Sequence, residues 1–183
     1  MADALGTGEQ ILILRKGGIH EDHGGFAIEH PEFLIFPTLF HQQRESVLPR
    51  AQARFDEISA QFPVTDRLRI ELFAKVIEGR RLDTLAAAEQ LRGQHIWRDE
   101  VIAGRFDWSR QKNIHALAVR IFRLPHVVEL PMLAAYAGCK SWIELESDIS
   151  VEGAQPVLDD ATFAQKLEHF RNALQLEAAG ARN

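Results

Sequence analysis

Residues 67–77 carry the most regular pattern in the chain, because apolar and polar side chains alternate along them. The even positions are all apolar: Leu68, Ile70, Leu72, Ala74 and Val76. The odd positions are mostly charged: Arg67, Arg69, Glu71, Phe73 and Lys75. Successive side chains on a β-strand point to opposite faces, so this period of two predicts a half-buried strand with one charged face.

Four shorter segments predict further strands, at residues 11–14, 26–30, 33–36 and 115–124. Each is rich in aliphatic or aromatic residues and is bounded by residues that favour turns, such as Gly17-Gly18 after the first and Pro125 after the last. Residues 20–25 lie between the first two of these segments and are expected to form a loop.

Apolar residues three and four positions apart predict two amphipathic helices. The first has Pro49 in its first turn and carries the stripe Ala51, Phe55, Ile58 and Phe62. The second lies within residues 156–178 and begins at Asp159 or Asp160. It carries the stripe Phe163, Leu167, Phe170 and Leu174.

Two shorter helices are expected between the long strands. One starts at Asp83 or Thr84 and stops at Gly93, and the other covers residues 95–103. Together these elements predict an α+β fold in a single domain at residues 1–183. In this fold a small mixed or antiparallel sheet packs against several helices, including a C-terminal amphipathic helix.

Charge and cysteine content exclude several classes of protein. The net charge of -5 argues against a globally basic nucleic-acid binder, although it allows a local basic patch. The single cysteine, Cys139, cannot form an internal disulfide. The chain has no apolar run of membrane-spanning length and no basic start followed by an apolar leader. We therefore expect a cytoplasmic protein that does not bind membranes.

Four phrases of the sequence resemble one known family. They are RKGGI at residues 15–19, HPEFLIFPTLFHQ at 30–42, ALAVRIFRLP at 116–125 and AGCKSW at 137–142. Taken together they resemble the domain of unknown function 1802 family, over residues 8–146. The resemblance implies a bacterial, cytoplasmic protein of uncharacterised activity and supplies no mechanism.

The most polar part of the chain is the segment at residues 11–42, which holds four of the eight histidines. Arg15 and Lys16 are followed by Gly17 and Gly18, so two cations and two backbone amides could approach an anion closely. The residues expected to orient such a ligand are His30, Thr38, His41 and Gln42. No Walker loop, dinucleotide fingerprint or pyrophosphate-hydrolase box is present.

Metal binding or proton transfer is the second hypothesis for this segment. Its imidazole and carboxylate groups, of the kinds that bind zinc, manganese or iron, are His20, Glu21, His23, His30 and His41. None of them has HExxH spacing. His30 and His41 could also serve as an acid and base pair, because imidazole titrates near neutral pH.

A second candidate site lies on the charged face of the long predicted strand. Asp66, Glu71 and Lys75 resemble the set used by metal-dependent nucleases, in which two carboxylates hold a divalent ion beside a lysine. The spacing differs from that set, and an ordinary solvated strand face explains the same residues.

The aromatic residues Trp97, Phe106, Trp108 and Trp142 are expected in or beside the core, although such rings can also stack on nucleic-acid bases. Three functions remain open from the sequence. The first is binding of a phosphate-bearing ligand, nucleotide or nucleic acid, at the N-terminal segment. The second is metal-dependent phosphodiester or phosphoester hydrolysis by Glu21, His30 and His41 or by Asp66, Glu71 and Lys75, and only this function requires a divalent metal. The third is a protein-interaction scaffold.

Overall fold

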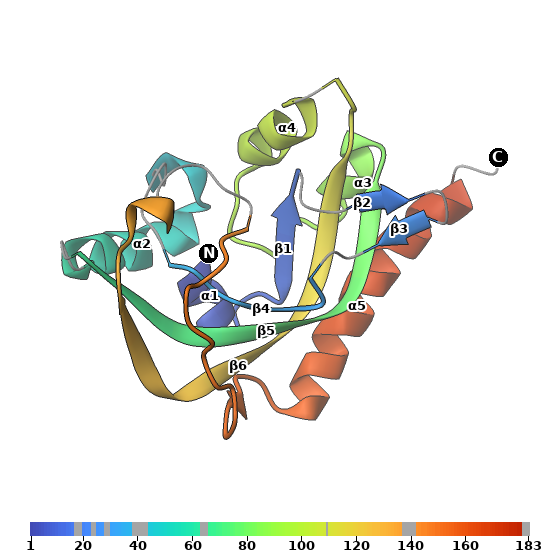
Figure 1. The fold of residues 1–183 in the computed structure, drawn as a ribbon. Helices are drawn as coiled ribbons and strands as arrows, with labels where there is room; N and C mark the ends of the chain where they lie inside the picture. The colour runs from blue at the N-terminus through green and yellow to red at the C-terminus, as the bar shows by residue number, and fades with distance from the viewer. Residues whose placement is uncertain are drawn as a thin grey trace.

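The computed structural model describes residues 1–16, 20–22, 25–27, 30–37, 44–62, 66–108, 110–136 and 142–180. Its centre is a pair of long antiparallel strands, β5 (Arg67–Leu82) and β6 (Ile114–Pro131), which are strongly curved (Figure 1). β1 (Leu12–Arg15) pairs with the first part of β6, and β4 (Glu32–Leu34) pairs with β5. The strand order β1-β6-β5-β4 is antiparallel throughout, and β7 (Gln155–Pro156) also pairs with β6.

Five α-helices accompany these strands in the part of the chain just defined: α1 (Ala2–Gly6), α2 (Pro49–Gln61), α3 (Leu85–Glu89), α4 (Asp99–Asp107) and α5 (Asp160–Gly180). The largest core cluster joins residues of all five to apolar residues of β1 and β6. Phe163, Leu167 and Phe170 of α5 are buried in this cluster, which confirms their predicted stripe. The α+β class and single domain predicted from the sequence are therefore confirmed.

The opposite face of the sheet is covered by an irregular segment rather than by long helices. The segment at residues 142–154 crosses this face, and apolar residues along it pack against a cluster that contains Leu68, Ile70, Phe73 and Tyr136. A short 3-10 helix, Ala134–Tyr136, leads toward this segment, and another, Arg44–Ser46, precedes α2.

An irregularity in the β5–β6 pairing corrects the predicted alternation of β5. Ile70 pairs with Val128 and Leu72 pairs with Arg123, so residues 124–127 of β6 face only Glu71. As a result Leu68 and Ile70 pack in one cluster, whereas Leu72 and Ala74 pack in another. The prediction that all five apolar residues share a face is therefore wrong.

The sequence predicts that the strand ends before Pro125. In the structure Pro125 lies inside this irregularity and β6 continues past it. Proline lacks the N–H that a strand ladder uses, and a bulge is one of the places where a strand accepts it. β6 therefore continues to Pro131.

Other predicted boundaries also differ. β2 (His20–Asp22) pairs with β3 (Gly25–Ala27), so residues 20–22 form a strand where a loop was predicted. α4 begins four residues later than the predicted helix at residues 95–103, because Trp97 forms a β-bridge with Val47. The cap of α3 agrees with the prediction, since the Thr84 hydroxyl accepts a 3.1 Å hydrogen bond from the Ala87 N–H.

The outer edge of β1 is covered by two side chains. The buried Gln10 amide donates to the Leu12 carbonyl at 2.7 Å, and the Arg105 guanidinium donates to the Leu14 carbonyl at 3.0 Å. The Arg105 guanidinium also lies 4.4 Å from the centre of the Trp97 ring. Such contacts satisfy backbone groups that would otherwise offer an open sheet edge.

Candidate functional site

The indole of Trp142 contacts residues from two other parts of the sequence. The Arg15 guanidinium lies 4.3 Å from the centre of its ring. The rings of His30 and Phe33 meet the indole edge to face, with centroid distances of 4.6 and 5.1 Å. We call Arg15, His30, Phe33 and Trp142 the Trp142 cluster.

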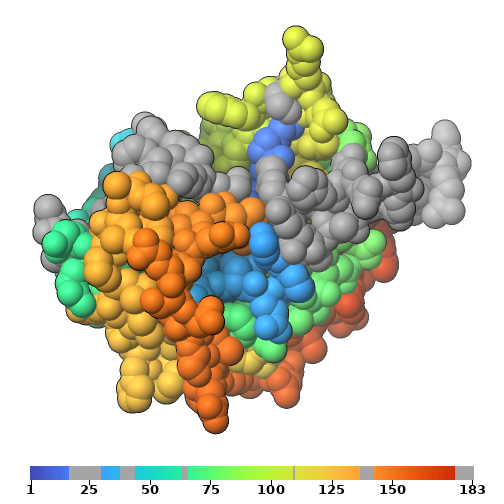
Figure 2. Space-filling model, in the orientation of Figure 1, coloured from blue at the N-terminus to red at the C-terminus, as the bar shows by residue number. Residues whose placement is uncertain are grey.

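The positions of these residues follow from the strands that carry them. Arg15 is the last residue of β1, where it pairs with His115 of β6. Phe33 pairs with Ala74 at the other edge of the sheet, and His30 lies just before β4. Trp142 begins the segment at residues 142–154, which lies beside residues 30–37 on the surface in Figure 2 (orange beside light blue).

Lys16 does not join its sequence neighbour in this cluster. Its ammonium donates hydrogen bonds to three backbone carbonyls, those of Phe106 at 3.0 Å, of Asn113 at 2.7 Å and of Gln111. Arg15 ends β1 and contacts Trp142, whereas Lys16 follows the strand and its ammonium reaches the end of α4. The structure therefore gives the Lys16 ammonium a role in holding the chain after α4.

His30 is exposed, whereas Arg15 and Trp142 are half-buried. Beside them, Glu32 and Lys75 form an exposed ion pair with 2.8 Å between the carboxylate and ammonium. The surface around His30 thus carries both signs of charge, and Arg15 supplies the cation that contacts the indole.

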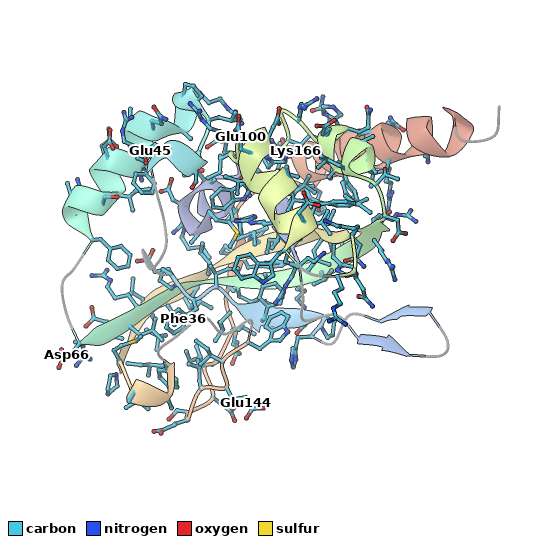
Figure 3. The ribbon with its side chains drawn as sticks, turned by 90° about the horizontal axis from the view of Figure 1, so that it is seen from above. Phe36, Glu45, Asp66, Glu100, Glu144 and Lys166 are labelled. Carbon is cyan, nitrogen blue, oxygen red and sulfur yellow. The ribbon has the colours of Figure 1, made fainter. Side chains whose placement is uncertain are left out.

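The nuclease-like set is spread along β5. Asp66 precedes the strand and lies at its outer end in Figure 3, whereas Lys75 pairs with Glu32 across the sheet. The Glu71 carboxylate lies 3.6 Å from the Arg69 guanidinium and 3.7 Å from that of Arg123. At a strand rise of about 3.3 Å per residue, the path along the strand from Asp66 to Lys75 is roughly 30 Å. The structure does not bring these three groups together.

Several predicted site residues lie outside the described part of the chain, namely Gly17, Gly18, His23, Thr38, His41 and Gln42. Glu21 falls within β2, of which only the backbone is described. Among the side chains that the structure describes, no group of three or more His, Cys, Asp or Glu residues could hold a metal ion. The same portion contains no helix that is both long and apolar enough to span a membrane.

The predicted burial of the aromatic residues is confirmed for Trp97 and Phe106, which are 3% and 8% exposed. It is wrong for Trp108, which is 84% exposed at the end of α4. The sequence analysis did not predict that Trp142 contacts Arg15. The one sequence feature that marked Trp142 was its place in the AGCKSW phrase.

A separate cavity of about 300 Å³ lies at the N-terminus of α4, with His95, Trp97 and Arg98 among its lining residues. The His95 Nδ1 accepts a 3.2 Å hydrogen bond from the Trp97 N–H. Burial, followed by the nearby Arg50, lowers the pKa of His95 to about 4. Its imidazole is therefore neutral at physiological pH.

The chain matches one known protein family. A family described as a domain of unknown function, DUF1802, matches residues 1–169. The chain belongs to the DUF1802 family. The match is longer than the residues 8–146 expected from the four phrases, and it includes the first ten residues of α5. Arg15, His30 and Trp142 lie within the DUF1802 match. No curated protein and no solved structure matches the chain.

Proposed function

We propose that the protein binds a phosphate-bearing ligand, a nucleotide or nucleic acid, at the Trp142 cluster. The observation that carries this proposal is the position of the Arg15 guanidinium over the Trp142 indole, with the exposed His30 against the same ring.

The chemistry of arginine supports a phosphate ligand. Stacking uses the flat face of the guanidinium, whereas its N–H donors lie in the plane and match the oxygens of a phosphate. An indole beneath the guanidinium holds that plane in one orientation, so less side-chain freedom is lost on binding.

His30 supplies a second group suited to the same ligand. An exposed imidazole can donate a hydrogen bond to a phosphate oxygen, and its ring can lie against a base. The mixed charges of the nearby Glu32 and Lys75 make Arg15 the main positive contribution. We therefore expect modest affinity that weakens as salt increases.

Titration of the purified protein with ATP and with a labelled single-stranded oligonucleotide tests this function. Four proteins are compared: wild type, Arg15→Ala, Arg15→Lys and the control Arg67→Ala. Arg67 is an exposed arginine at the far end of β5, so the control removes the same charge at a distance. We expect Arg15→Ala to weaken binding about tenfold or more, since a charge-assisted hydrogen bond contributes about 1.5–3 kcal/mol.

Arg15→Lys should recover only part of that affinity, because lysine keeps the charge and lacks the planar fork. Arg67→Ala should bind like wild type. Equal affinity of Arg15→Ala and wild type for both ligands would refute the proposed site. A protein that binds neither ligand would favour the scaffold function instead.

A further inference from the structure

Trp108 is the most exposed large apolar side chain among the described residues. It is 84% exposed, although Phe106, two residues earlier on α4, is buried. An indole so exposed contributes little to the core, and aromatic residues are enriched at binding interfaces.

The chain on both sides of Trp108 is held in place by Lys16. The Lys16 ammonium bonds to the carbonyl of Phe106 before the tryptophan and to those of Gln111 and Asn113 after it. Lys16 follows Arg15 directly, so the segment that presents Trp108 is fastened to the same end of β1 as the Trp142 cluster. In Figure 1 the end of α4, the tip of β1 and the start of the segment at residues 142–154 follow one another along the upper part of the molecule.

Arg110, two residues after Trp108, adds a positive charge to this surface. Its side chain is exposed and makes no ion pair within the described chain. Lys112 and Arg81 are neutralised, because Lys112 pairs with Asp107 at 2.5 Å and Arg81 pairs with Asp83 at 2.7 Å. An exposed indole beside this arginine suits a ligand that has flat apolar rings joined by negative charges.

We infer that the ligand is single-stranded nucleic acid that passes around the end of β1, with its backbone at Arg15 and one base stacked on Trp108. This inference rests on the proposed function and names its ligand class. A mononucleotide would occupy the Trp142 cluster alone, because Arg15 contacts Trp142 whereas the chain on both sides of Trp108 is bonded to Lys16. A duplex keeps its bases stacked inside, whereas single strands offer them to aromatic side chains.

The test is a pair of titrations, one with adenosine monophosphate and one with a single-stranded oligonucleotide of about 12 nucleotides, within the usual range of such sites. The proteins are wild type, Trp108→Ala, Trp108→Phe and Arg15→Ala. Trp108 is exposed, so its variants should fold normally, and thermal melting checks this. We expect Trp108→Ala to weaken binding of the oligonucleotide about tenfold and to leave binding of the mononucleotide unchanged. Trp108→Phe keeps a ring and should recover most of the affinity.

The outcomes separate this inference from the function on which it rests. If Arg15→Ala weakens binding and Trp108→Ala does not, the extended strand is refuted and the proposed function survives. If Arg15→Ala has no effect, the proposed function fails and the inference falls with it. Binding of anionic lipid vesicles that Trp108→Ala abolishes, without any effect on the oligonucleotide, would assign Trp108 to a membrane surface and refute the inference. Loss of a dimer in Trp108→Ala would instead assign the residue to contact between copies of the chain.

Discussion

Arg15 and Lys16 are neighbours at the end of β1, yet their side chains contact different parts of the molecule. Arg15 stacks on Trp142 at 4.3 Å, and the Lys16 ammonium bonds to three backbone carbonyls around the end of α4. Arg15 is therefore the cation that is suited to a ligand, and Lys16 is the cation that stabilises the fold.

Replacement of Lys16 by methionine should destabilise the protein. The apolar side chain keeps the length of lysine, but three carbonyls lose their shared donor, at a cost of about 1.5–3 kcal/mol. The free energy of unfolding in urea measures the effect. Lys112→Met is the matched control, because the Lys112 ion pair is exposed and should contribute less than about 1 kcal/mol. Equal losses in the two variants would contradict the holding role of Lys16.

Gln10 should be among the most sensitive polar positions. Its side chain is 1% exposed, donates to the Leu12 carbonyl and accepts a 3.0 Å bond from the Ile96 N–H. Gln10→Leu leaves both backbone groups buried without a partner, so we expect a loss of about 2–4 kcal/mol. Gln155→Leu, at an exposed position on β7, should change stability by less than about 0.5 kcal/mol. A neutral effect of Gln10→Leu would show that these groups find other partners.

His95 should make stability fall in acid. Its folded pKa of about 4 lies below the ordinary 6.5, so the unfolded chain binds a proton between these values while the native state does not. The stability is complete above pH 6.5 and decreases as the pH falls toward 4, by about 2–3 kcal/mol at pH 4.5. Urea unfolding at pH 7 and pH 4.5 measures this difference.

His95→Gln removes the titrating group, so its stability should vary less between the two pH values than that of wild type. His126→Gln, at an exposed position on β6, serves as the control and should keep the wild-type dependence. An unchanged pH dependence in His95→Gln would mean that His95 is protonated in the native protein.

The contact between Arg15 and Trp142 should be measurable as a coupling energy. A double-mutant cycle with Arg15→Ala and Trp142→Ala compares the unfolding free energies of the two single variants and the double variant. We expect a coupling of about 0.5–2 kcal/mol, the range of a partly buried cation–π contact. Additive losses would indicate that the two side chains do not stabilise one another.

The sequence was informative where local chemistry decides the structure. The Thr84 cap, the Pro49 start of α2 and the apolar stripe of α5 depend on neighbouring residues, and they agree with the prediction. The alternation along β5 failed at Glu71, because residues 124–127 of the partner strand bulge opposite it. A pattern within one strand contains no information about an insertion in its neighbour.

Arg15 and His30 of the candidate site could be singled out from the sequence, whereas Trp142 could not. Arg15 and His30 stood out because charged and imidazole groups interrupt an apolar segment. Their common contact, Trp142, lies on a distant segment, and its place is decided by tertiary packing. Trp108 was assigned to the core because aromatic residues usually are, but it is 84% exposed at the end of α4.

The most direct test of the account is to observe the Arg15 Nε–H and the Trp142 indole N–H by NMR during titration with a single-stranded oligonucleotide. We expect both signals to shift progressively with ligand, while the Arg67 Nε–H at the far end of β5 stays constant. Unchanged Arg15 and Trp142 signals at a concentration that saturates binding would contradict the proposed site.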